Sequence, residues 1–127
     1  MAEDGHYPYQ APIDAYGNGG FRFADMSHRG SLLCLPSGMH AWKPATAKDI
    51  TLAALAPVLA MADEIDVLLI GLGDDIAAID PAIRTAFRER KVIVEAVATG
   101  GAVRTYNVLL GEKRAVGAAL IAVERGR

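Results

Sequence analysis

The 127-residue chain contains one cysteine, Cys34, and one tryptophan, Trp42. A single thiol cannot form an intrachain disulfide or a zinc site built on paired cysteines. The chain also lacks a run of about 20 apolar residues that could cross a bilayer, and its acidic, polar start does not match a secretory signal. Its net charge of −2 lacks the positive excess of nucleic-acid-binding domains. We therefore expect a cytoplasmic protein with no membrane span, no nucleic-acid partner and no metal.

The composition is that of a folded domain. Hydrophobic residues make up 52% of the chain and charged residues 22%, which excludes a disordered polypeptide. The length fits one domain. Residues 1–12 hold two prolines and scattered polar groups, and we interpret them as a flexible N-terminal lead-in. Residues 13–127 are then expected to form a single α/β domain.

Short apolar runs separated by turn residues fill the first half of the chain. Asn18-Gly19-Gly20 predicts a hairpin between the runs on either side of it, because Asn and Gly adopt the positive φ angles that tight hairpins need. Ser31–Leu35 and Met39–Trp42 have the composition of two further strands. The pattern over residues 13–43 predicts a small antiparallel β layer.

Helical patterns dominate the second half. Thr51–Ala62 is rich in alanine and leucine and predicts a helix that Pro57 shortens or kinks. Asp80 is suited to be the N-cap of a second helix, because proline follows it at the first helical position. A third helix is expected over about residues 100–111, with Thr99 as its N-cap.

Three continuous apolar runs alternate with these helices. They predict buried strands over Ile65–Ile70, Val92–Val97 and Ala115–Val123. The resulting β-α-β-α-β order implies a layered α/β core in which at least two neighbouring strands are parallel.

The segment LLIGLGDD, residues 68–75, ends one of these strands and invites comparison with a dinucleotide-binding loop. Such a loop has the pattern G-x-G-x-x-G and opens directly into a helix. Gly71 and Gly73 fit the pattern, but Ile76 occupies the third position and the next helix starts only at Asp80. A sharp turn off a central strand is the better interpretation.

The position of this turn still suggests a site. In open α/β sheets, ligands bind outside the carboxyl ends of the strands. If the two strands are parallel, the loops that follow them open at the same edge, where glycine amides at a helix start could hold an anion. The candidate pocket, with ordinary turns as its alternative, is lined by Gly71, Gly73, Asp74, Gly100, Gly101 and Arg104.

Other chemical groups are weaker candidates. Cys34 could pair with His28 or His40, but it lies in an apolar run, where a buried, inert thiol is the usual outcome. The carboxylates on the loop before residue 67 are interpreted as solvated rather than as a metal site: Asp63, Glu64 and Asp66.

Four stretches together resemble one family. IDAYGNGGFRF, GSLLCLPSGMHAW, EIDVLLIGLGD and RTYNVLLGEKRAVGAALI are similar, in order and spacing, to the small domain shared by mitochondrial complex I (NADH:ubiquinone oxidoreductase) assembly factor 3, the adipogenesis-associated domain protein and many uncharacterised prokaryotic proteins. The resemblance covers about residues 13–121. Its most specific pieces are Pro36–Trp42, Gly71–Asp74 and Thr105-Tyr106-Asn107 followed by Ala118-Ala119-Leu120.

This resemblance implies a fold of three layers: a central mixed β-sheet with helices on one face and a small antiparallel β layer on the other. It carries over no catalytic residue and no cofactor, because the family has no established ones. Two positions depart from the usual pattern. Leu72 replaces a small or hydroxyl residue and would crowd an anion pocket, and Gly100 replaces a proline.

The resulting interpretation is a non-enzymatic protein-interaction module that acts as a respiratory complex I assembly factor. Its partners would be respiratory complex subunits or other assembly factors. The expected working surface comprises Gly71–Asp74 and the segment from Arg104 through Tyr106 to Asn107, with Trp42 nearby. The alternative is a small-molecule or anion-binding protein, or an enzyme, that uses the edge at Gly71–Asp74 and Thr99–Arg104.

Overall fold

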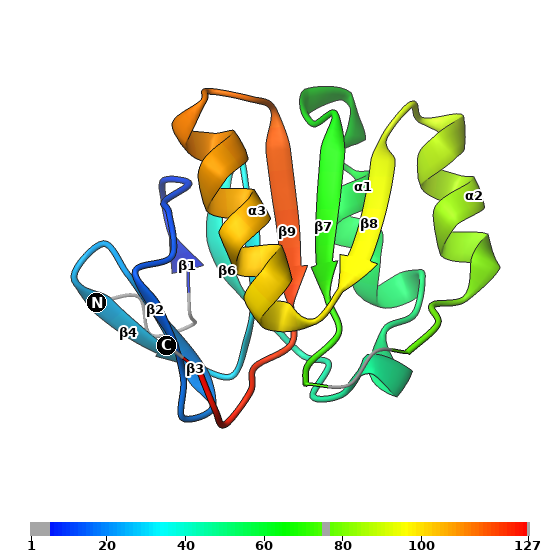
Figure 1. Ribbon diagram of the computed structural model, residues 1–127. Coiled ribbons are helices and arrows are strands. Elements are labelled where there is room, and N and C mark those ends of the chain that lie inside the picture. Colours follow the sequence, from blue (N-terminus) through cyan, green and yellow to red (C-terminus); the bar gives the residue numbers. More distant parts are fainter. Residues whose placement is uncertain (1–5, 75–76, 127) are drawn as a thin grey trace.

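A mixed six-stranded sheet forms the centre of the protein (Figure 1). The computed structural model describes residues 6–74 and 77–126. The strands lie in the spatial order β1 (His6–Tyr7), β6 (Gly38–Trp42), β5 (Ser31–Leu35), β9 (Val116–Leu120), β7 (Val67–Gly71) and β8 (Ile93–Val97). The β5 strand is antiparallel to β6 and β9, whereas β7 is parallel to both β8 and β9.

A smaller antiparallel sheet and several helices complete the fold. The small sheet contains β2 (Ala15–Gly17), β3 (Gly20–Phe23) and β4 (Met26–Arg29). The helices are α1 (Ala56–Leu59), α2 (Pro81–Glu89) and α3 (Thr99–Gly111), and the 3-10 turns are η1 (Ala47–Asp49), η2 (Ala53–Leu55) and η3 (Ala62–Glu64).

The predicted fold class is confirmed: the protein is a layered α/β domain with a central mixed sheet and a small antiparallel layer. One detail differs, since α3 shares a face with the small sheet instead of lying beside α1 and α2. Leu68 and Ile70 pack in the core on the α1/α2 side, whereas Leu69 packs with Tyr106 of α3 and Phe21 of the small sheet.

The handedness of the crossovers explains the two faces. The chain passes from β7 through α2 to β8 in one direction, then returns past β7 through α3 to β9. Both connections join parallel strands and are therefore expected to be right-handed. Because they run in opposite directions along the sheet, their helices must cover opposite faces.

The small β layer differs from the one predicted over residues 13–43. β5 and β6 belong to the central sheet, because every residue of β5 is buried and its side chains supply both core clusters. The third strand of the small sheet is instead β4, whose polar sequence MSHR gives no apolar pattern. The predicted hairpin is confirmed: Gly17 pairs with Gly20, and Asn18 and Gly19 have φ angles of 53° and 76°.

The predictions for the helices and strands of the second half had mixed outcomes. Thr51–Ala62 forms short helical pieces rather than one helix, because Pro57 lies in the first turn of α1 and cannot continue a preceding helix. Asp80 caps α2 as predicted, accepting a hydrogen bond from the Ala82 N–H at 2.9 Å. The β8 strand is not buried on both faces, because α3 does not cover the face that carries Ile93, Glu95 and Val97.

The N-terminal segment is attached to the domain from residue 6 onward; residues 1–5 of the predicted lead-in lie outside the described range. Tyr7 pairs with Met39 across β1 and β6. The Gln10 side chain donates a hydrogen bond to the Val116 carbonyl at 2.7 Å, and Ala11 is buried in the core.

Gly71 provides a test of the close contact between β7 and the start of α3. A Cβ atom at this position would lie 2.9 Å from Thr99 Oγ1 and 3.0 Å from Thr99 Cα, and the second of these atoms is backbone. We expect Gly71→Ala to lower the free energy of unfolding by about 1–3 kcal/mol, measured by urea denaturation. Gly111→Ala is the control, because open space surrounds that position. Equal midpoints for both variants would contradict the close contact.

Candidate functional site

The two glycine-containing loops meet at one edge of the sheet, as the parallel arrangement predicts. The Leu72 N–H donates to the Val97 carbonyl at 2.8 Å, and the Thr99 N–H donates to the Gly73 carbonyl at 2.9 Å. Asp74 follows on the exposed side. Residues 75–76, the last of LLIGLGDD and the position of the missing third glycine, lie outside the described residues.

The Thr99 side chain occupies the space between these loops. Its hydroxyl accepts a hydrogen bond from the Gly73 N–H at 3.0 Å and donates one to the Ile121 carbonyl at 2.7 Å. The prediction that Thr99 is the N-cap of α3 is wrong. The N-cap is Ala98, and the Thr99 hydroxyl bonds to Gly73 and Ile121 instead of to the first turn of the helix. The Gly73 amide is consequently already bonded and not directed at a ligand.

The predicted pocket residues divide into a buried and an accessible group. Gly71 and Gly73 are buried, whereas Gly100 and Gly101 are half-buried. The Tyr16 hydroxyl lies where a Cβ atom on residue 100 would be, so a side chain there would have to displace the Tyr16 ring. Asp74 and Arg104 remain, and both are exposed.

Tyr106 and Asn107 hold the N-terminal segment against α3. The Tyr106 hydroxyl donates to the Ala11 carbonyl at 2.7 Å. The Asn107 side chain accepts from the Ile13 N–H and donates to the Ile13 carbonyl, both at 2.8 Å. Trp42 is similarly internal, since its indole N–H donates to the Ala54 carbonyl at 2.8 Å. The polar groups of these three predicted site residues serve the fold.

Cys34 does not lie in a Cys–His arrangement. Its side chain is fully buried, and burial raises the pKa of the thiol far above its ordinary value, an effect that a hydrogen bond with Tyr106 reduces. His40 is opposite Leu33 across β5 and β6, so it faces away from Cys34, and its Nε2 lies 2.8 Å from Ser37 Oγ. His28 Nε2 lies 3.0 Å from the Ser31 carbonyl oxygen.

The acidic loop before β7 lies at the surface. Asp63 forms an ion pair with Arg90 at 3.1 Å, and both side chains are exposed, so the pair contributes little stability. In residues 6–74 and 77–126, no three His, Cys, Asp or Glu side chains are grouped so as to hold a metal ion.

An exposed apolar surface appears where the sequence predicted a buried strand. Ile93 and Val97 of β8 are 61% and 37% exposed, and Val108 of α3 is 58% exposed. In Figure 1, α3 lies in front of β9, and no helix lies in front of β8. We call the group Ile93, Glu95, Val97, Gly101, Arg104 and Val108 the β8–α3 surface; the exposed Glu95 lies between the two apolar residues on the same face of β8.

The two elements meet around Gly101. A Cβ atom on Gly101 would lie 3.6 Å from Val97 and 3.9 Å from Arg104 Nη2, so these side chains meet over the glycine. Val108 follows Arg104 after about one helical turn. The sequence did not reveal this surface, since a continuous apolar run also fits a strand covered on both faces.

The outer edge of β8 is protected by α2. The backbone groups of Ile93 and Val97 face β7, with the Ile93 N–H donating to the Asp66 carbonyl at 2.9 Å. Val94 therefore directs its carbonyl away from the sheet. The Arg84 guanidinium donates to that carbonyl at 2.9 Å. This contact occupies a backbone acceptor that would otherwise be free.

The protein is thus a layered α/β domain. It exposes apolar side chains on β8 and α3, and hydrogen bonds join the loops at Gly73 and Thr99. The chain belongs to the family described as "Protein of unknown function (DUF498/DUF598)", whose model matches residues 13–121. The family resemblance seen in the sequence is thereby confirmed.

Relatives and solved structures agree with this membership. An uncharacterized protein of Rhodobacter capsulatus is 42% identical over 87% of this chain and 83% of its own length. NADH dehydrogenase [ubiquinone] 1 alpha subcomplex assembly factor 3 of Xenopus tropicalis is 32% identical over 86% of this chain, which spans 60% of that protein's length. A Bartonella henselae crystal structure named an outer membrane protein is 50% identical, with a TM-score of 0.90 over 94% of this chain and all (100%) of that one.

The helices give no indication of a membrane span: within the part of the chain that the structure describes, none combines the length and the apolar character needed to cross a bilayer.

Asn107→Ala tests the attachment of the N-terminal segment. The change leaves the Ile13 N–H and carbonyl without their partner, and we expect a loss of about 1–3 kcal/mol in the free energy of unfolding. Hydrogen exchange at the Ile13 amide should accelerate. Thr105→Ala, on the exposed side of α3, is the matched control. Unchanged exchange at Ile13 would contradict the role of Asn107.

The buried thiol predicts a dependence of stability on pH. Cys34 stays protonated in the folded state, whereas the unfolded thiol ionises near its ordinary pKa of about 8.5. Because the unfolded state then binds fewer protons, the free energy of unfolding should fall by about 1 kcal/mol between roughly pH 8.5 and 9.5. Denaturation of Cys34→Ala should lack this decrease; an identical slope in both proteins would refute it.

Proposed function

We propose that this protein is a non-enzymatic interaction module that acts in the assembly of respiratory complex I. The relatives named as assembly factor 3 support the proposal, including the Mus musculus protein, which is 30% identical over 91% of this chain. The observation that carries it is the β8–α3 surface. The proposal keeps the predicted cytoplasmic location, and the Rhodobacter capsulatus relative supports a bacterial source.

The composition of the β8–α3 surface suits a protein partner. Ile93 and Val108 place large apolar side chains in water, and grouped exposed apolar side chains mark interaction sites. Arg104 adds a guanidinium that has no ion pair with any described residue. Arginine beside apolar side chains is enriched at protein interfaces.

The surface is also held in place before any partner binds. Its residues lie on a strand and a helix rather than on loops, and Thr99 ties the start of α3 to the ends of β7 and β9. Little ordering would therefore be needed on association, which favours affinity.

The alternative, an anion or small-molecule site or an enzyme at the loop edge, has less support. It would depend on Gly100, Gly101 and Arg104, because the Gly73 N–H is bonded to Thr99. The engagement of the Gly73 amide by Thr99 is the reason we prefer a protein partner.

The proposal is tested by affinity purification of the tagged protein from cells that encode it. Ile93→Asp with Val108→Asp should lose the co-purified complex I subunits, because burying either carboxylate in an apolar interface is unfavourable. Tyr9→Asp is the matched control, since Tyr9 is also apolar and 69% exposed but lies in the N-terminal segment.

A second measurement separates binding from assembly. Deletion of the gene should lower NADH oxidation by membranes, and the wild-type and Tyr9→Asp proteins should restore it, whereas the double variant should not. Normal NADH oxidation by membranes of the deletion strain would contradict the proposal. So would equal recovery of complex I subunits by the double variant and by the wild type.

A further inference from the structure

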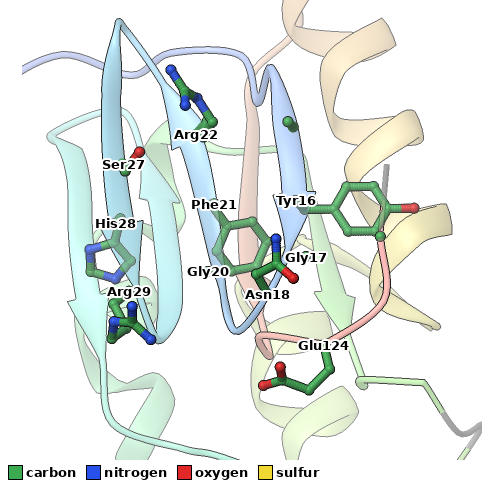
Figure 2. Close-up of a pocket in the computed structure, with 12 residues that line it drawn as sticks. Tyr16, Gly17, Asn18, Gly20, Phe21, Arg22, Ser27, His28, Arg29 and Glu124 are labelled. Carbon is green, nitrogen blue, oxygen red and sulfur yellow. The ribbon is translucent and has the colours of Figure 1, made fainter.

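A hollow of ≈ 660 Å³ lies along the small sheet formed by β2, β3 and β4 (Figure 2). The residues that matter for its chemistry come from all three strands: Ala15, Gly17, Gly20, Arg22, Ser27 and Arg29. Glu124, from the C-terminal segment, lines it near Asn18. We call this the small-sheet groove.

The strand register places the two arginines on one face. Arg22 is opposite Ser27, and Gly20 is opposite Arg29. Because side chains alternate along a strand, Arg22, Ser27 and Arg29 share a face, and Phe21 and Phe23 point into the core on the other. Diagonal neighbours such as Arg22 and Arg29 have Cα atoms about 7–8 Å apart. In Figure 2 the two side chains extend toward opposite ends of the small sheet, so both must rotate inward for their guanidinium groups to reach one ligand.

Small residues make the floor of the groove. Ala15 is opposite Arg22, and Gly17 is opposite Gly20. A Cβ atom on Gly20 would collide with the His28 carbonyl oxygen, so the closeness of the strands requires a residue without a side chain there. The close approach of β3 and β4 therefore shapes the floor of the groove, while longer side chains, among them Arg22, Arg29 and Glu124, also line it.

The positive charges in the groove are not neutralised by neighbouring side chains. Within the described residues, neither Arg22 nor Arg29 has an ion pair, and no hydrogen bond involves either guanidinium or the Ser27 hydroxyl. Glu124 is the acidic residue among those that line the hollow. Asp14 and Asp25 are exposed and lie close in sequence to the groove residues, but neither is within ion-pair distance of an arginine.

We propose that the small-sheet groove binds a small organic phosphate. The phosphate would lie between Arg22 and Arg29 and accept a hydrogen bond from Ser27. Each guanidinium group can donate two parallel N–H···O hydrogen bonds to phosphate oxygens. The organic part would lie over Gly17 and Gly20, with a hydroxyl or amine donating to Glu124. The hollow has the size of ordinary small-molecule sites.

This site is separate from the proposed docking surface. The β8–α3 surface lies at the β8 edge of the central sheet, whereas the small sheet lies toward β1 and β6 at the other side of the molecule (Figure 1). The groove and the docking surface can therefore be tested independently, and failure of one leaves the other standing.

The experiment is a titration of the ¹⁵N-labelled full chain with ribose 5-phosphate, followed by amide chemical shifts. We expect saturable shifts at residues 15–29 and near Glu124. Arg22→Gln with Arg29→Gln should weaken binding at least about tenfold, because charge-assisted contacts are lost. Arg88→Gln, on the exposed side of α2, is the matched control and should bind as the wild type does.

Three further titrations decide the ligand class. Ribose should produce no saturable shift, and inorganic phosphate should bind more weakly than ribose 5-phosphate. Equal affinity for inorganic phosphate would overturn the assignment to an organic phosphate. Absence of saturable shifts with ribose 5-phosphate at millimolar concentration, or binding of only a single-stranded oligonucleotide, would overturn the proposal altogether. Spectra of the arginine variants away from the groove report that they remain folded.

Discussion

The arrangement of the central sheet depends on the buried hydroxyl of Thr99. This single group joins the loop after β7, through the Gly73 amide, to the chain leaving β9, through the Ile121 carbonyl. It also lies in the first turn of α3, so it sets where that helix begins. Gly71 makes the contact possible, because a larger residue would meet Thr99 directly. A buried hydroxyl with both of its hydrogen bonds satisfied stabilises such a junction without an unpaired polar group.

The position of α3 has consequences on both of its sides. Toward β9 and the small sheet, Tyr106 and Asn107 bind the backbone at Ala11 and Ile13 and so attach the N-terminal segment. Toward β8, the helix stops short of the edge strand and leaves Ile93 and Val97 accessible. The same helix thus completes the core and limits the area it covers, which creates the exposed surface.

Local chemistry made part of this fold predictable. The hairpin at Asn18-Gly19, the Asp80 cap and the extent of α3 follow from interactions within a few residues, and each agrees with the structure. Which strands join the central sheet depends on distant pairing, so the place of Ser31–Leu35 was missed. The short pieces around Pro57 were likewise obscured by a helix-like composition.

Sequence reasoning predicted the meeting of the two loops better than it predicted the roles of the residues there. The loops at Gly71–Asp74 and Thr99–Gly101 do meet, because parallel strands end at the same side. The orientation of individual side chains could not be read from spacing, so Asn107 and Trp42 were expected at a surface and are used internally. The exposure of Ile93 depends on how far α3 extends across the sheet toward β8, and no local sequence pattern predicts this.

The contact between Arg84 and the Val94 carbonyl would also restrict how the proposed partner docks. An incoming strand would have to displace this guanidinium before it could extend the central sheet at β8. Docking onto the side chains of Ile93 and Val97 needs no such displacement. Contact through side chains makes the fit depend on the partner's amino-acid sequence, whereas main-chain pairing would accept many extended segments. The arginine therefore disfavours sheet-to-sheet pairing at β8 and, at the proposed docking surface, would favour selective association.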